Sequence, residues 1–189
     1  IIDKYGIPGK NCRFVFNGDF VDRGPKQIEV LLTLLYCSLM YPSRVYLNRG
    51  NHEDLSINLS RHFDPNFKKD IDSKYGKYST TIFNESQRLF RRLPIATIIE
   101  NNVGFRCFIT HGGLSDRLSM SYIKSTSFDR YKFASISAKS TDDAQTRKTA
   151  EMFTDLLWSD PITSKSGGSL NGCHPNNHRG AGYLFGANI

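Results

Sequence analysis

Several features are scarce in this chain of 189 residues, and each absence excludes a class of protein. No apolar stretch approaches the ~20 residues that a helix needs to span a bilayer, and no charged segment followed by an apolar one stands at the start. The cysteines Cys12, Cys37, Cys107 and Cys173 form no C-x-x-C pair, which argues against a zinc ribbon and a disulfide framework. We therefore expect a soluble protein without a membrane span, in the cytoplasm or also the nucleus.

Basic residues are more numerous than acidic ones but form no basic tract. The formal net charge is +7, yet no block of five or more like charges occurs, whereas nucleic-acid-binding proteins concentrate Lys and Arg on one face or segment. We therefore predict no nucleic-acid partner. The length fits one domain, but the chain begins with Ile1 rather than methionine, so we expect residues 1–189 to be one partial domain, truncated at both ends.

Apolar patterning predicts alternating strands and helices. Strands are expected over residues 14–17 and 45–47, and helical spacing predicts a helix over 28–40 between them. Such a βαβ unit implies parallel strands. The other expected elements are a helix over 78–92 with Ile82, Leu89 and Phe90 inward, a hairpin of 96–99 and 105–110, a variable surface insertion with helix fragments over 115–149, a helix over 150–157 and a loop over 163–177.

Polar segments follow three of the predicted strands. Gly18-Asp19-Phe20-Val21-Asp22-Arg23-Gly24 follows the first, Gly50-Asn51-His52-Glu53 follows the second, and His111 follows the second strand of the hairpin. Open α/β folds bind ligands where the carboxyl ends of their strands meet. We therefore expect these three segments to form one site.

The residue types at this edge suit the hydrolysis of a phosphate ester by two metal ions ~3.5–4 Å apart, which hold and acidify a bridging water. Asp19, at a strand end, is placed to bridge the ions. Asn51 and His111 offer an amide oxygen and an imidazole to one ion. Taken singly, a capping role for Asp19 and a core role for His111 are the more common outcomes.

The remaining polar residues suit the leaving group and the phosphate. His52 stands beside Asn51 and cannot easily bind the same ion, so the role left for it is general acid, protonating a departing serine or threonine oxygen. Asp22 is the candidate carboxylate that orients its imidazole. Arg23 has a planar fork of donors that suits two phosphate oxygens, and Arg179 could meet them from the other side. An arginine before a glycine is more often a solvated surface residue.

These blocks resemble, in order and spacing, the phosphoprotein phosphatase family of serine/threonine phosphatases. The resemblance covers nearly the whole chain apart from residues 115–149. Residues 16–20, 47–54 and 171–176 look most like the phosphatases with EF-hands, the retinal degeneration C group, and the tetratricopeptide-containing phosphatase shares part of this pattern. The blocks are residues 18–24, 50–53, 111–113 and 157–161, and Arg179-Gly180 followed by Phe185-Gly186.

The resemblance implies a four-layer αββα metallophosphoesterase sandwich with mixed sheets. It also implies a protein serine/threonine phosphatase that acts on phosphoproteins with two metal ions, usually assigned as manganese, iron or zinc. The roles it implies are Asp19 as bridging ligand, Asn51 and His111 as ligands of the second metal, His52 as acid with Asp22 behind it, Arg23 and Arg179 as phosphate clamps, and Asp160 on the substrate cleft.

Parts of the family's pattern are missing. A Gly-Asp-x-His-Gly block would lie upstream of Ile1 and a last histidine ligand beyond Ile189, so the first metal retains only Asp19. We therefore expect this chain alone to be inactive, and any calcium or calmodulin control to lie outside it, because no EF-hand loop is visible. The alternatives are another metallophosphoesterase, such as a phosphodiesterase, and a catalytically dead pseudophosphatase that serves as a binding module.

Overall fold

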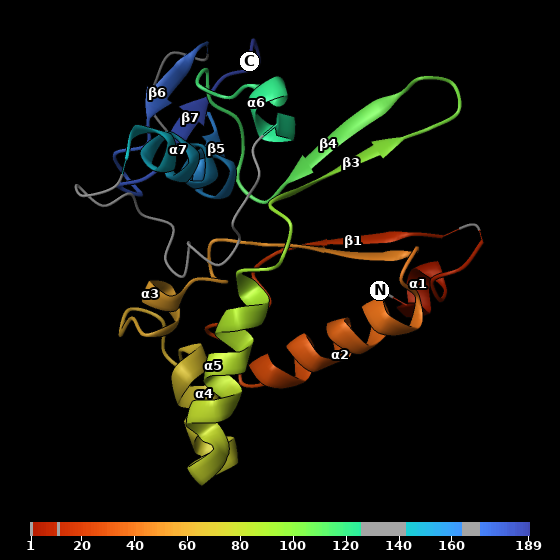
Figure 1. Cartoon of the computed structure of the whole chain (residues 1–189), viewed down its shortest axis with the longest axis vertical. Helices are drawn as coiled ribbons and strands as arrows, with labels where there is room; N and C mark the ends of the chain where they lie inside the picture. Colours follow the sequence, from red (N-terminus) through yellow and green to blue (C-terminus); the bar gives the residue numbers. More distant parts are fainter. Residues whose placement is uncertain (1, 11, 126–142, 164–170) are drawn as a thin grey trace.

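The computed structural model describes residues 2–10, 12–125, 143–163 and 171–189 (Figure 1). Figure 1 shows one group of elements from α1 to α5 and a second group formed by the β3–β4 hairpin, α6, α7 and the last three strands. The described elements are α1 (Ile2–Tyr5), β1 (Phe14–Asn17), α2 (Gln27–Met40), β2 (Val45–Asn48), α3 (Leu55–Asn58), α4 (Phe67–Tyr75), η1 (Gly76–Tyr78), α5 (Ser79–Phe90), β3 (Ala96–Glu100), β4 (Arg106–Thr110), α6 (Met120–Ser125), α7 (Ala144–Trp158), β5 (Asp160–Pro161), β6 (Cys173–Pro175) and β7 (Tyr183–Phe185).

The first group contains the predicted βαβ unit. Strands β1 and β2 pair in parallel, with Phe14 opposite Val45 and Asn17 opposite Asn48. Helix α2 connects them and buries Ile28 and Leu31 in the core. The parallel pairing and the helix are therefore confirmed, and the carboxyl ends of both strands lie at one edge.

Helices α4 and α5 pack beside each other and complete this core (Figure 1). Asn66 caps α4 by accepting a hydrogen bond from the backbone N–H of Lys69 at 2.9 Å. The predicted helix over 78–92 is found as α5, and the three residues of its predicted inner face all pack on the core. Phe90 is fully buried as expected, whereas Ile82 and Leu89 are only partly buried. The buried face of α5 also includes Ser79, Phe83, Ser86 and Gln87. Ser86 donates to Ile82 O at 2.9 Å, and Gln87 donates to Asn58 Oδ1 at 2.7 Å.

The second group holds two small sheets. Strands β3 and β4 form the predicted antiparallel hairpin, and β5, β7 and β6 form a mixed sheet in that order. Helix α7 begins at Ala144 rather than at residue 150, because Asp143 caps it by accepting a hydrogen bond from Thr146 N at 2.8 Å. Part of the segment predicted as an insertion is therefore α6 and α7, and its residues 126–142 lie outside the described residues.

Part of the segment predicted as a loop over 163–177 forms a strand. Cys173–Pro175 form β6, paired antiparallel with β7, so the composition of this segment concealed a short strand. Residues 164–170 of the same prediction lie outside the described residues. None of the helices in the described ranges is both long and apolar enough to cross a membrane.

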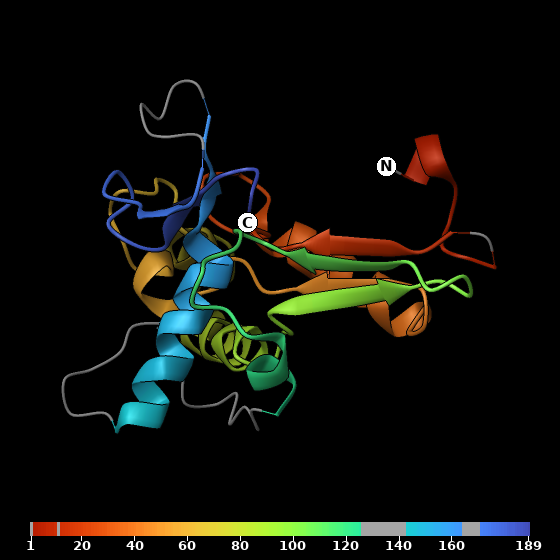
Figure 2. The ribbon, with the colours of Figure 1, turned by 90° about the horizontal axis from the view of Figure 1, so that it is seen from above.

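Side-chain amides of Asn17 and Asn48 join the two groups where β1, β2 and β4 end. Figure 2 shows these strands running alongside one another. Asn48 is fully buried and donates to Asn17 Oδ1 at 2.9 Å and to Ile109 O at 3.2 Å, while Thr97 donates to Asn48 Oδ1 at 2.7 Å. Asn17 in turn donates to Thr110 O at 2.8 Å. The ends of β1, β2 and β4 are therefore tied together, which places their following loops side by side.

Candidate active site

The loop after β1 has an unusual backbone. Asp19, Asp22 and Arg23 have φ values of 57°, 70° and 69°, in the left-handed region that residues other than glycine seldom occupy. Gln27, at the start of α2, holds the loop in place by accepting from Asp22 N at 2.6 Å and donating to Gly24 O at 2.9 Å. Such a conformation persists only where its surroundings impose it, and it is typical of functional loops.

Glu53 joins this loop to the loop after β2. Its carboxylate is fully buried and accepts backbone N–H groups from Gly50 at 2.7 Å, Asp19 at 2.9 Å and Phe20 at 2.8 Å. Burial raises the pKa of Glu53, the charge of Asp19 raises it further, and the three N–H donors oppose both effects. Sequence reasoning assigned no role to Glu53, which sets the spacing between the two loops.

The loop after β1 and the loop after β2 approach so closely that position 50 requires glycine. A Cβ atom there would lie 2.5 Å from Asp19 N and 2.6 Å from Asp19 Oδ1, well inside the contact distance. The absence of a side chain therefore lets the second loop reach the Asp19 carboxylate. The backbone N–H of His52 donates to Asp19 Oδ1 at 3.2 Å as a result.

His111 and Asp19 meet at the end of β4. His111 Nδ1 lies 2.6 Å from Asn17 O, to which it donates, and Nε2 lies 3.3 Å from Asp19 Oδ1. A histidine whose other nitrogen is fixed by a carbonyl has the orientation usual in metal ligands.

Asn51 carries an observation that points to a ligand. The residue is only 6% exposed, and its Oδ1 has no hydrogen-bond partner among the described residues. A buried amide oxygen without a partner is costly, and a cation would compensate for it. Within the described residues no three His, Cys, Asp or Glu side chains converge as a metal cluster, so a site here depends on the Asn51 amide together with Asp19 and His111.

His52 and Asp22 form a buried pair. His52 Nδ1 donates to Asp22 Oδ2 at 2.7 Å, and the Asp22 side chain is fully buried. Asp22 also accepts from Asn58 Nδ2 at 3.0 Å and from Phe67 N at 2.7 Å, while Asn58 donates to His52 O at 2.7 Å. Both the imidazole and its carboxylate are thus fixed from several sides, as the predicted positioning of His52 by Asp22 requires.

Arg23 lies against the same imidazole. Its Nη2 donates to His52 Nε2 at 2.9 Å, and its guanidinium stacks 5.0 Å from the ring centre of Phe63. The edge of the Phe63 ring also meets His52, with 4.7 Å between ring centres. One aromatic ring therefore contacts both polar side chains.

Arg179 and Asp160 lie together on an open groove that Trp158 and Asn176 also line. Arg179 makes a bidentate contact with Asp160, whose Oδ2 also accepts from Asn176 at 2.9 Å. The hydrogen bonds that Arg179 donates to Asp160 raise the pKa of Arg179, and the charge of Asp19 raises it further. Arg179 is thus paired with a carboxylate in this structure rather than presented alone.

A comparison with protein-family models matches all residues, 1–189, to Metallophos, the calcineurin-like phosphoesterases. The chain belongs to this family. Among curated relatives, serine/threonine-protein phosphatase rdgC of Drosophila melanogaster is 38% identical over 100% of this chain, and serine/threonine-protein phosphatase with EF-hands 1 of Mus musculus is 36% identical over 100%. Serine/threonine-protein phosphatase T of Saccharomyces cerevisiae is 36% identical over 98%. The chain spans 26%, 31% and 30% of these three proteins, respectively.

A solved protein structure also matches this chain. A protein serine/threonine phosphatase from Saccharomyces cerevisiae, described as similar to human phosphatase PP5, superposes with a TM-score of 0.67 at 32% identity. The match covers 98% of this chain and 48% of that one. The predicted resemblance to the phosphoprotein phosphatases and the predicted metallophosphoesterase α/β fold are therefore confirmed. Membership implies divalent metal ions in general, for which the oxygens of Asp19 and Asn51 and the nitrogen of His111 are suitable donors.

Three residues of this calcineurin-like site were missed by sequence reasoning. Glu53 stood in a recognised segment, but its position there does not indicate that it binds a loop 34 residues away. Asn58, in α3, and Phe63, in the segment that follows, carry no motif at all. Only Glu53 had a signal in the sequence, namely its place directly after Asn51 and His52. The sequence offered no signal for Asn58 or Phe63.

Proposed function

We propose that the protein is a metal-dependent serine/threonine protein phosphatase that hydrolyses phosphoserine and phosphothreonine in proteins. The observation that carries this proposal is the row formed by Asp22, His52 and Arg23 beside the unpartnered amide oxygen of Asn51. An oriented imidazole, a guanidinium and an oxygen ligand are the groups that leaving-group protonation, phosphate binding and metal binding need.

Asp19, Asn51 and His111 would hold metal, and we propose manganese, iron or zinc as the ion, with two ions in the intact domain. When bound, these ions supply charge neutralisation on the phosphoryl oxygens and a water of lowered pKa. Asp19 would hold an ion together with His111, because its Oδ1 lies 3.3 Å from His111 Nε2, and the bridging role of Asp19 is the one that the family resemblance implies.

The other residues act on the ester itself. His52 Nε2 would carry the proton for the departing serine or threonine oxygen, with Asp22 holding Nδ1. In this structure Arg23 donates a hydrogen bond to His52 Nε2. Because Nε2 accepts this hydrogen bond, it must take up from solvent the proton that it delivers to the leaving group. A phosphate that draws Arg23 to its oxygens leaves Nε2 free to do so, so substrate binding and the supply of this proton are linked through one guanidinium.

Arg179 and Asp160 line a groove with Trp158 and Asn176, and we propose that a phosphate held by Arg23 also meets Arg179. Arg179 donates to Asp160 in this structure, so a phosphate must compete with Asp160 for the guanidinium. Phosphoproteins are the proposed substrates, by analogy with relatives named as protein phosphatases. Relatives named for EF-hands suggest calcium control from regions outside these residues. A cytoplasmic location remains part of the proposal.

The test compares three substrates: a phosphoserine peptide, a phosphothreonine peptide and a phosphodiester. The full product of the gene and the 189-residue chain are assayed with excess Mn²⁺, and we expect the full product to release phosphate from both peptides. His52→Asn should lower kcat about 10²–10⁴-fold with metal content unchanged. His62→Asn, at an exposed histidine ten residues on, is the matched control. Preference for the diester, or a loss below about threefold for His52→Asn, would overturn the proposal.

A further inference from the structure

A buried amide, that of Asn58 at the end of α3, holds the pair of His52 and Asp22 together. Asn58 is fully buried, and its Nδ2 donates to Asp22 Oδ2 at 3.0 Å and to His52 O at 2.7 Å. An ionised carboxylate and a backbone carbonyl only accept hydrogen bonds, so the amide must present its nitrogen to both. One side chain thus ties the carboxylate of Asp22 to the backbone of the histidine that it orients.

Gln87 of α5 determines which way this amide faces. The residue is buried, and its Nε2 donates to Asn58 Oδ1 at 2.7 Å. A flipped Asn58 amide would bring two NH₂ groups together at Gln87 and would place its oxygen against the carboxylate of Asp22. Both contacts leave buried polar groups unsatisfied, which is costly. Gln87 therefore fixes the orientation of Asn58, one hydrogen bond further from the acid.

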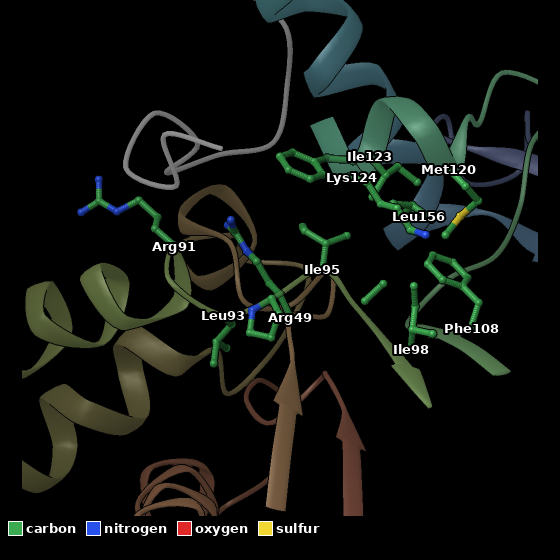
Figure 3. Close-up of a pocket in the computed structure, with 13 residues that line it drawn as sticks. Arg49, Arg91, Leu93, Ile95, Ile98, Phe108, Met120, Ile123, Lys124 and Leu156 are labelled. Atoms are coloured by element: carbon green, nitrogen blue, oxygen red, sulfur yellow. The ribbon is translucent and has the colours of Figure 1, made fainter. Parts of the chain in front are cut away.

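The backbone of Gln87 is held in the last turn of α5. Its carbonyl oxygen accepts from Arg91 N at 3.3 Å and from Arg91 Nε at 3.2 Å. Figure 3 shows Arg91 at the end of this helix, on the opposite side of an apolar pocket from Ile98 and Phe108. The side chain of Arg91 thus closes the end of α5, and the position of Gln87 is set by the helix rather than by a loop.

Helix α4, which packs against α5, holds the other oxygen of the same carboxylate (Figure 1). Phe67, the first residue of α4, donates its backbone N–H to Asp22 Oδ1 at 2.7 Å. The two oxygens of Asp22 are therefore held from two packed helices, Oδ1 by α4 directly and Oδ2 by α5 through Asn58. Asp22 itself lies in the loop after β1, so these contacts give a loop residue the support of a helical pair.

We propose that Asn58 and Gln87 are positioning residues for the general acid. They keep Asp22 where His52 Nδ1 meets it, so that Nε2 is aimed at the departing oxygen and gives up its proton there as the P–O bond of the ester breaks. A misplacement of ~1 Å can cost about 10²-fold in rate, so the hydrogen bonds of this amide bear directly on kcat. The inference rests on the proposed function, because it concerns the protonation of a serine or threonine oxygen.

The test uses two leaving groups to separate proton donation from every other role. The full product of the gene is assayed with Mn²⁺ on a phosphoserine peptide, whose alkoxide needs a proton, and on p-nitrophenyl phosphate, whose phenolate leaves without one. Asn58→Leu keeps the size of the side chain but removes the donor. It should lower kcat on the peptide at least about tenfold and on the aryl phosphate less than about threefold, with KM values within about twofold. His52→Asn defines the full size of this difference.

A second variant and a control complete the test. Gln87→Leu should change the ratio of the two kcat values in the same direction by at least about threefold, because it releases the Asn58 amide. It decides the question if Asn58→Leu does not fold. Asn84→Leu, at an exposed asparagine of the same helix, is the control and should leave both rates unchanged. Each ratio is taken on one preparation, so it does not depend on the fraction of protein that is folded.

The outcomes separate this inference from the proposed function. Equal losses on the two substrates, or a ratio that a folded variant leaves unchanged, would overturn the positioning role while the phosphatase activity of the unchanged protein stands. An unchanged protein that releases no phosphate from the peptide would contradict the proposed function, and the inference with it.

Discussion

Replacing Glu53 by glutamine tests whether one buried carboxylate holds the active-site loops together. Glutamine keeps the shape of the side chain but converts one acceptor oxygen into a donor nitrogen. Glu53 Oε2 accepts from Asp19 and Gly50, and Oε1 accepts from Phe20. The nitrogen must therefore face at least one backbone N–H, where two donors meet and neither is satisfied.

The magnitude follows from these three bonds. A buried donor left without an acceptor costs about 1–3 kcal/mol, and each of the two remaining bonds loses about 1 kcal/mol when its acceptor becomes neutral. The burial that raises the pKa of Glu53 acts in the other direction, because glutamine has no charge to desolvate. We expect a net loss of about 3 kcal/mol, a large share of the ~5–15 kcal/mol that stabilises a domain.

The measurement is the free energy of unfolding from urea titration at neutral pH, for the chain without added metal. Glu85→Gln is the control, because Glu85 is an exposed partner of Arg88 and such pairs contribute about 0–1 kcal/mol. Ordinary surface substitutions change the free energy of unfolding by less than about 0.5 kcal/mol. If the value for Glu53→Gln differs from that of the unchanged chain by no more than this, the carboxylate is not what joins the two loops.

Three further predictions concern the same site. Gly50→Ala should cost about 1–3 kcal/mol of unfolding free energy, because its Cβ would lie 2.5 Å from Asp19 N; Gly24→Ala, with open space at its Cβ, should change little, and equal effects would contradict the argument. Phe63→Leu should raise KM for a phosphopeptide about 2–5-fold and Phe63→Tyr should not, whereas equal KM values would remove the ring from the site. Mn²⁺ should raise the melting temperature of the chain but not of Asn51→Ala, and an equal rise would exclude Asn51 as a ligand.

The fold was predictable where local pattern decides structure. Strand β1, helix α2 and strand β2 follow from apolar runs and helical spacing, and parallel pairing follows from their order. The start of α7 was wrong by six residues, since the Asp143 cap lies in a segment with few apolar residues. Helix α4 was not predicted, because its sequence is largely charged and Phe67 and Ile71 are the apolar residues that it buries.

The candidate site, like the fold, could be predicted only in part from the sequence. Residues whose chemistry is visible in a motif, such as His52 and Asp22, could be paired from the sequence, and the structure places them 2.7 Å apart. Glu53 and Asn58 could not be assigned, because their partners lie on other loops and only the folded backbone determines which N–H groups they meet. The pairing of Arg179 with Asp160 was missed for the same reason, as each had been assigned to the substrate.

The left-handed backbone at Asp19, Asp22 and Arg23 has a consequence for protein engineering and for evolution. Glycine at any of these positions would relax the chain by roughly 1–2 kcal/mol, somewhat less for aspartate, which tolerates this region better. The same change would delete a side chain that the proposed chemistry needs. Selection for a more stable fold and selection for activity therefore oppose each other here, so thermostabilising substitutions should be sought at other positions.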